Sequence, residues 1–325
     1  MEGYKAFTKG LVCRDKQYAE NTVFEENTEI CSKGMHFCKN PLDVFEYYPL
    51  VDKKGNITEF AEVEALDNAE TDDGKQFCTK KLKIGSKLSL SQFIEASFDF
   101  AYQNIESQAE ASDGETLVGS TYAKFVGGNH AELVGDDCAK LVGGEAAILV
   151  GGIDATAVGG NYATVVGQYC AKLVGGDCAK LIGDAGATVV GGNFAELVGG
   201  DCTTLTGGYS AKLVGGDCAK LVGDASAILV GGDGAILTGG SGATLTGGTY
   251  AKLIGDYNTT LTGGSDAIIV GDHNSVAKGK KGSIIVLVER DSNLNIVDFK
   301  AVQVDGKKIK EDVLYKLENG ELIQV

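Results

Sequence analysis

The chain has 325 residues and a formal net charge of −16, with 47 glycines but only 2 prolines. This charge argues against direct binding to nucleic acid, because clustered Lys and Arg are needed to neutralise phosphates. Glycine at this level, without the Gly-X-Y period of collagen or a Ser/Gln bias, indicates a folded repeat rather than collagen or a disordered chain.

The start of the chain and its apolar segments predict a cytoplasmic protein that makes no contact with a membrane. Residues 1–5 have no basic region that leads into an apolar one, so no signal peptide is predicted. No run of 18 apolar residues exists, so no membrane-spanning helix is predicted. The nine cysteines form no Cys-x-x-Cys pair, and we interpret them as reduced cytosolic thiols.

Residues 1–111 lack the period that follows and are expected to form a small α+β domain. Asn40 before Pro41 is a helix N-cap followed by an N1 proline, which predicts a short helix there. Residues 60–65 alternate between apolar and polar types, as a half-buried strand does.

A second helix is predicted at the end of this domain. Residues 89–92, SLSQ, form a capping-box pattern. Apolar residues follow at helical spacing: Phe93, Ile94, Phe98, Ala101 and Ile105. Because this helix would end where the repeats begin, we expect its apolar side to cover the first coil, whose strand edge is otherwise unpaired.

Residues 113–272 consist of twenty consecutive octads without an insertion, of which residues 217–224, DCAKLVGD, are typical. Position 7 is Gly in all twenty octads, position 3 is Ala in seventeen and position 5 is Leu in fifteen. Position 6 is Val in fourteen, Ile in two and Thr in four. A repeat this regular must be explained before any other feature, since it determines the fold.

The octads predict a β-solenoid over residues 112–280. Positions 3 and 5 lie on one face of a short strand because side chains alternate with a period of two. Stacked coils then place Ala on Ala and Leu on Leu inside, while position 4 points outward. Gly at position 7 is expected to form the corner, where a positive φ or a close backbone approach excludes a Cβ. A helix is excluded because Gly in every octad would cost about 1 kcal/mol per site.

Two coil sizes are open, with two octads or three octads per coil. At about 4.8 Å per coil, the solenoid would be roughly 48 Å long in the first case and roughly 32 Å in the second. We favour two octads, a coil of 16 residues, because four of the five position-2 cysteines then lie on one side. These four are Cys138, Cys170, Cys202 and Cys218, and the fifth is Cys178.

Residues 281–325 are expected to form a C-terminal β-meander that caps the solenoid, after a degenerate octad at residues 273–280. Residues 283–288, SIIVLV, predict a buried strand, and Asn319-Gly320 is a hairpin turn signal. The expected fold class is therefore mainly β: an octapeptide-repeat β-solenoid between a small α+β domain and a β cap.

Several segments resemble a family of bacterial and phage octapeptide-repeat proteins that has no assigned function. They are residues 3–7 (GYKAF), 33–44 (KGMHFCKNPLDV), 278–282 (KGKKG) and 315–320 (YKLENG). The resemblance covers the whole chain and implies a short N-terminal domain, octapeptide repeats, a C-terminal β cap and a mobile-element setting. The repeats also loosely resemble the half-repeats of ice nucleation proteins.

No metal and no cofactor are expected. Residues 231–234, GGDG, are similar to calcium-binding β-roll repeats, but those are nonapeptides, and Ala235 fills the inward position where they supply Asp. Structural zinc sites usually have tight Cys-x₂₋₄-Cys knuckles, which this chain lacks. The possible zinc ligands are therefore interpreted as packed side chains: Cys13, Cys31, His36 and Cys38.

Catalysis is not expected either. His36 and Cys38 would share a face of a strand, as a base and a nucleophile require, but such a pair more often reflects packing. Acids that could assist His36 are Glu46, Glu62 and Glu64. Ice binding is not expected, because outward positions 4 and 6 are both Thr in only three octads.

An outward apolar row at position 6 predicts a homodimer, because contiguous exposed apolar surface usually marks an interface. The alternative is that position 6 tucks into the corner. The predicted self-association row contains Val126, Val134, Val142, Val150, Val158, Val166 and Val174.

Charge is placed unevenly in the octads, which hold seventeen acids and seven lysines. Fourteen acids occupy corner positions 8, 1 or 2, whereas all seven lysines occupy position 4. Ten net charges over roughly 48 Å give one per about 5 Å, against one per about 1.7 Å in duplex DNA. The candidate binding residues are Asp136, Asp137, Asp177, Asp184, Asp201, Asp217, Asp224 and Asp233.

The acidic corners favour a non-enzymatic scaffold or binding protein, and three explanations of them stay open. The solenoid could be a partial DNA mimic, a decoy that occupies a host protein such as a DNA-binding defence nuclease. The acids could instead only keep a long rod soluble. In the third explanation the solenoid is a rigid spacer that presents the N-terminal domain.

Overall fold

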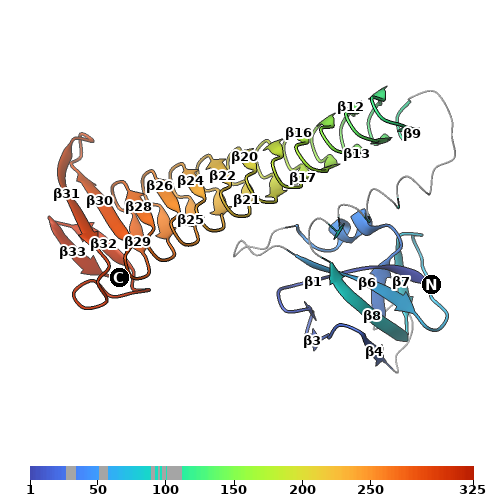
Figure 1. The fold of residues 1–325 in the computed structure, drawn as a ribbon, viewed down its shortest axis with the longest axis horizontal. Helices are drawn as coiled ribbons and strands as arrows, with labels where there is room; N and C mark the ends of the chain where they lie inside the picture. Colours follow the sequence, from blue (N-terminus) through green and yellow to red (C-terminus); the bar gives the residue numbers. More distant parts are fainter. Residues whose placement is uncertain (27–33, 51–57, 89–91, 94–95, 97–99, 101–111) are drawn as a thin grey trace. The chain divides into compact units, whose positions relative to one another are not determined.

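The computed structural model describes residues 1–26, 34–50, 58–88, 92–93, 96, 100 and 112–325. The chain divides into two compact units, Met1–Gln108 and Ala109–Val325 (Figure 1). Within the described residues, no helix has both the length and the apolar character needed to span a membrane.

The N-terminal unit is built on a six-stranded antiparallel sheet with the order β4-β8-β6-β1-β5-β7. Its strands are β1 (Glu2–Phe7), β4 (Thr22–Glu25), β5 (Met35–Cys38), β6 (Glu59–Ala65), β7 (Gln76–Thr79) and β8 (Lys81–Leu88). A short hairpin of β2 (Val12–Cys13) and β3 (Lys16–Gln17) follows β1. The core cluster of this unit includes Phe7, Tyr18, Met35, Phe37 and Leu82.

Two of the elements predicted in this unit are confirmed. The short helix is a 3₁₀ helix, η1 (Pro41–Glu46), and the Asn40 side chain accepts a hydrogen bond from the Leu42 N–H at 3.0 Å. Strand β6 covers the predicted strand at residues 60–65. The helix predicted from residue 89, with its proposed cover over the first coil, falls mostly outside the described residues. Phe93, which is described, is buried and stacked on Phe60.

The second unit is a parallel β-solenoid whose strands alternate between two sheets (Figure 1). The first solenoid sheet contains β9 (Thr116–Gly119), β11 (Glu132–Gly135), β13 (Ile148–Gly151), β15 (Thr164–Gly167), β17 (Lys180–Gly183), β19 (Glu196–Gly199), β21 (Lys212–Val214), β23 (Ile228–Val230), β25 (Thr244–Thr246), β27 (Thr260–Thr262) and β29 (Val276–Lys278). The second solenoid sheet contains β10 (Lys124–Val126), β12 (Lys140–Val142), β14 (Thr156–Val158), β16 (Lys172–Val174), β18 (Thr188–Val190), β20 (Thr204–Gly207), β22 (Lys220–Gly223), β24 (Ile236–Gly239), β26 (Lys252–Gly255), β28 (Ile268–Gly271) and β30 (Ile284–Arg290).

Each coil contains two octads, so the preferred coil of 16 residues is confirmed. Leu133 pairs with Leu149 in the first solenoid sheet, and Leu141 stacks on Ala157 in the second. Each sheet contributes eleven solenoid strands, which gives eleven coils rather than the ten of the regular octads. The eleventh coil forms because the degenerate octad supplies β29, and β30 continues the second sheet beyond residue 280.

The invariant Gly at position 7 faces the core rather than adopting a positive φ. A Cβ on Gly143 would lie 2.6 Å from the Cβ of Ala147, a contact far closer than non-bonded carbon atoms adopt. The left-handed residue of each corner is position 2 instead, with φ of 57° at Cys138 and 61° at Tyr162. The sequence predicted either a positive φ or a close backbone approach at this glycine. A close approach is correct, but the neighbouring atom belongs to a side chain inside the coil rather than to backbone.

Antiparallel strands end the parallel stack. Strand β31 (Ile296–Gln303) pairs with β30, and β32 (Tyr315–Glu318) pairs with β29 and with β33 (Glu321–Gln324). The predicted turn is confirmed, with Asn319 and Gly320 at φ of 52° and 73°. Strand β30 is buried on one face only, because the second solenoid sheet leaves its outer face to solvent.

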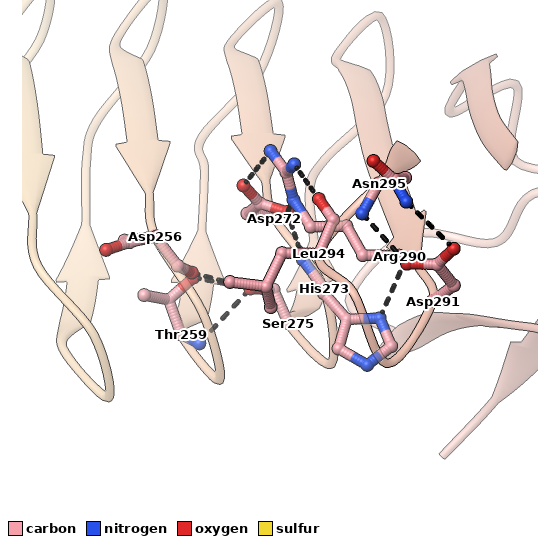
Figure 2. Close-up of polar contacts among 9 residues, drawn as sticks. All are labelled: Asp256, Thr259, Asp272, His273, Ser275, Arg290, Asp291, Leu294 and Asn295. Carbon is pink, nitrogen blue, oxygen red and sulfur yellow. Dashed lines mark hydrogen bonds and ion pairs between the residues drawn. The ribbon is translucent and has the colours of Figure 1, made fainter. Parts of the chain in front are cut away.

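A polar cluster ties this cap to the last coils (Figure 2). The Arg290 guanidinium donates two hydrogen bonds to the Asp272 carboxylate, from Nε at 2.7 Å and from Nη2 at 2.8 Å. A third bond runs from Nη1 to the Leu294 carbonyl at 2.8 Å. The Arg290 backbone N–H donates to His273 Nδ1 at 3.1 Å. Arg290 therefore joins the end of β30 to the corner between β28 and β29 through a bidentate ion pair.

Candidate functional site

The N-terminal unit contains a cavity of about 840 Å³. Its walls come from β1, the β2–β3 hairpin, β5 and the segment around η1, and they include Lys5, Cys13, Tyr18, His36, Cys38 and Tyr48. Cavities of roughly 300–1,000 Å³ are the usual size for small-molecule ligands. This cavity is therefore the candidate binding site.

Lys5 is the unusual residue of the cavity, because only 5% of it is exposed. It lies on the same face of β1 as the core residue Phe7, two positions away. Its Nζ donates to the His36 carbonyl at 2.6 Å and lies 5.5 Å from the centre of the Tyr18 ring. Burial lowers the pKa of Lys5, and none of the ion pairs within the described part of the chain includes it.

A thiol lies beside this amine. Cys13 closes the β2–β3 hairpin, and its nearby thiol partly opposes the fall in the pKa of Lys5. The Tyr48 hydroxyl, just after η1, donates to Cys13 Sγ at 2.8 Å. Strand β1, the β2–β3 hairpin and the segment after η1 thus bring an amine, a thiol and a phenol together at the cavity wall.

The pair considered for catalysis lies on the neighbouring strand. Cys38 is buried, and desolvation followed by the charge of Asp43 raises its thiol pKa to about 12. Burial, followed by the charge of Lys5, lowers the pKa of His36. Near neutral pH, Cys38 is therefore a protonated thiol, and His36 is an uncharged ring.

The structure separates the acids that were considered with His36. Glu46 shares the cavity with His36 and forms an ion pair with Lys75. Glu62 and Glu64 line a second cavity of about 720 Å³. Of the possible zinc ligands, three line the first cavity and Cys31 falls outside the described residues: Cys13, His36 and Cys38 are the three. Where side chains are described, no group of three His, Cys, Asp or Glu could hold a metal ion.

Residues 1–96 match the family model of a domain of unknown function, DUF7666. The match confirms the expected N-terminal domain without an assigned function, and it contains the whole cavity wall named above. No curated protein and no solved structure matches the chain. The family match ends before the first solenoid strand, β9.

The predicted acidic residues divide between two corners of the solenoid. The first corner joins each strand of the first solenoid sheet to the next strand of the second, and the second corner joins the second sheet back to the first. The first corner contains Asp136, Asp137, Asp184, Asp201, Asp217 and Asp233, and the second contains Asp177 and Asp224.

These carboxylates accept hydrogen bonds from backbone N–H groups of the corners, a role that was not predicted from the sequence. At position 1 the carboxylate reaches the next coil, so Asp201 Oδ1 accepts the Asp217 N–H at 2.9 Å. At position 8 it reaches only the next residue, so Asp184 Oδ1 accepts the Ala185 N–H at 2.8 Å. Position-1 asparagines do the same as the aspartates, as Asn193 does with the Tyr209 N–H at 2.9 Å.

The position-1 ladder accompanies nine of the thirteen octads that end in Gly-Gly. A Cβ on Gly216 would lie 2.2 Å from Asp201 Oδ1 and 2.9 Å from the Asp201 backbone nitrogen, so the ladder and the corner backbone both oppose a side chain fifteen residues later. All nine Asp or Asn residues at position 1 of the octads are followed by Gly at that distance. The Asp and Gln residues at position 8 all stack on other residue types. This spacing is visible in the sequence and could have revealed the ladder.

The predicted self-association row does not form one row, because successive octads lie on opposite sheets. Val126, Val142, Val158 and Val174 belong to the second solenoid sheet, and Val134, Val150 and Val166 to the first. On the second sheet Val126 is 70% exposed and Val142 43%, whereas Val150 on the first is 1% exposed. Any self-association through these residues would have to use the second sheet.

Proposed function

We propose that the chain is a non-enzymatic binding protein in which the DUF7666 domain binds a small oxyanion, a carboxylate or a phosphate ester, in its cavity. The supporting observation is Lys5, an amine that is 5% exposed and lies at the cavity wall. A buried amine without an acidic partner destabilises a fold, because its charged form loses hydration. A bound oxyanion would supply the missing partner.

The solenoid acts in this proposal as a rigid rod that carries the domain. Its inward Ala and Leu ladders are fully buried from coil to coil, as at Ala211 and Leu213. Its corner N–H groups are bound by backbone carbonyls and by the carboxylates described above. A rod of this regularity supports a scaffold role and needs no binding site of its own.

Thermal unfolding of the full-length protein tests the proposal, with small carboxylates and phosphate esters as probes and uncharged analogues beside them. A ligand at one hundred times its Kd stabilises the folded state by about 2.7 kcal/mol. We expect an oxyanion to raise the unfolding temperature of the N-terminal unit in the wild type but not in Lys5→Met. Lys9→Met, which removes an exposed lysine, is the control. If every oxyanion affects wild type and Lys5→Met equally, the cavity is not the site.

The acidic decoy is the second candidate, and one observation favours it. Asp201, Asp217 and Asp233 lie on the same corner in three consecutive coils. Their spacing is about 4.8 Å, against about 3.4 Å between phosphates along one DNA strand. The partner would be a host protein that binds DNA, held by contacts that weaken as salt is added.

Replacing Asp201, Asp217 and Asp233 by Asn tests the decoy without breaking the corner. Asn129, Asn161 and Asn193 already make the same inter-coil bond in this chain, so only the charge is removed. If the solenoid is a decoy, this triple variant must bind the DNA-binding partner more weakly, and its binding must depend less on salt concentration. Unchanged affinity and salt dependence would leave the rod as a scaffold.

A further inference from the structure

The solenoid carries five thiols at position 2 of its octads, and two of them form a pair. All five are free cysteines: Cys138, Cys170, Cys178, Cys202 and Cys218. Cys202 and Cys218 are sixteen residues apart, so they occupy the same corner position in consecutive coils. Both are exposed. The other three have Asp, Gly or an aromatic residue at this position in the adjacent coils.

The corner backbone holds these two residues in the same conformation. Both have φ of 57°, and the Cys202 N–H donates to the Asp217 carbonyl at 2.8 Å, as the Cys218 N–H does to Asp233. The strands that follow pair in register, with Thr204 opposite Lys220. The two Cα atoms are therefore one coil apart, about 4.8 Å. Disulfides join Cα atoms that are about 4.4–6.8 Å apart.

The side chain at this position points along the solenoid toward the next coil. A Cβ on Gly186 would lie 3.1 Å from Cys170 Sγ, and a Cβ on Gly234 would lie 3.6 Å from Cys218 Sγ. Because the coils repeat, Cys202 Sγ is directed in the same way at the Cβ of Cys218. The first thiol already faces its neighbour, and the second must rotate about its Cα–Cβ bond to meet it.

We propose that Cys202 and Cys218 are a modification site, a dithiol that closes to an inter-coil disulfide by exchange with a small-molecule disulfide such as oxidised glutathione. One protein thiolate attacks the reagent, forms a mixed disulfide and releases one small thiol. The second thiolate attacks the mixed disulfide and releases the other. Two protein thiols become one disulfide, the reagent is reduced to two thiols, and the protein's two protons end on them.

The bond should be easy to reduce again. Two superposed coils hold their Cβ atoms about 4.8 Å apart, whereas disulfides average about 3.8 Å. Closure must therefore draw the corners together, and strained, exposed disulfides are the labile ones. The dithiol is thus a reversible link between the coils that contain β20 and β22, independent of the DUF7666 cavity.

Mass spectrometry of the folded, full-length protein tests the pair. The protein is incubated with oxidised glutathione or with uncharged hydroxyethyl disulfide, since Asp201 and Asp217 flank the thiols and could repel an anionic reagent. The remaining thiols are alkylated before trypsin digestion. Cleavage after Lys180, Lys212 and Lys220 separates the two cysteines, so an internal bond links peptides 181–212 and 213–220 at a mass two hydrogens below their sum.

We expect this linked pair as the main product at Cys202 and Cys218, while Cys170 and Cys178 carry separate mixed disulfides. In Cys218→Ser, Cys202 should carry the mixed disulfide instead. A brief treatment with a dithiol reductant should remove the link while the solenoid stays folded. Separate adducts on Cys202 and Cys218 in the wild type, with no linked peptide from either reagent, would overturn the proposal.

Discussion

The two units of this chain pair their polar groups in opposite ways. In the solenoid, many corners use one of two repeated arrangements: a position-1 Asp or Asn accepts an N–H of the next coil, or a position-8 Asp accepts the N–H of the next residue. In the N-terminal unit, the buried Lys5 amine has the His36 carbonyl and the Cys13 thiol as neighbours, and it forms no ion pair with a described acid. Periodic pairing stabilises a rod, whereas an isolated amine at a cavity is costly and typical of a functional site.

The largest expected effect separates the two units thermodynamically. Leu213→Ala removes a fully buried side chain from the Leu ladder and should destabilise the solenoid by about 2–5 kcal/mol. The unfolding of the N-terminal unit should not change, since the two units have separate cores. Denaturant unfolding followed by hydrogen exchange checks this unit by unit. An equal loss of stability in both units would mean that they unfold together.

The second test concerns the lone amine. Burial lowers the pKa of Lys5 in the folded state below the ordinary value of about 10.4, so the unfolded chain binds more protons between the two values. Stability of the N-terminal unit should therefore rise as the pH increases through the folded pKa toward about 10.4. Lys5→Met should abolish this rise and stabilise the unit near neutral pH. Lys9→Met should keep it, and urea unfolding at several pH values measures both.

The third test concerns the ion pair that holds the cap (Figure 2). The hydrogen bonds from Arg290 lower the pKa of the Asp272 carboxyl. The ion pair contributes its full stabilisation of the fold above the unfolded Asp pKa of about 3.9. This stabilisation is lost as the pH falls through the lower pKa that Asp272 has in the folded state. Arg290→Gln should therefore move acid unfolding of the cap to higher pH. Lys300→Gln, on the neighbouring strand, should not, and amide exchange of β31 reports the difference.

The same contrast explains what the sequence could predict. The octads determine the solenoid because each position meets its own copy sixteen residues away, so a local pattern decides the packing at Ala211 and Leu213. For Gly143 the sequence predicted that a side chain is excluded but placed the cause in the corner backbone. The cause is the Ala147 side chain inside the coil, and the spacing of the glycines alone does not distinguish the two. The cavity could not be predicted, because Lys5, Cys13 and Tyr48 come together only when the sheet, the hairpin and η1 are in place.

The smallest expected effect compares the two corner arrangements, the position-1 bond to the next coil and the position-8 bond to the next residue. Asp201→Ala removes one inter-coil hydrogen bond and should cost about 1 kcal/mol, whereas Asp201→Asn should be nearly neutral. Gly216→Asp alone should be worse, because its Cβ would meet Asp201 Oδ1. The double variant Asp201→Tyr with Gly216→Asp reproduces the arrangement of Tyr169 and Asp184, in which the second carboxylate binds its own neighbour's N–H.

The double variant should therefore recover most of the stability that Gly216→Asp loses. A double-mutant cycle in denaturant measures this as a coupling energy, expected at about 1 kcal/mol or more because the two side chains compete for one space. If the two substitutions are additive, the ladder does not exclude a side chain at position 8. The pattern of Gly-Gly octads would then need another cause.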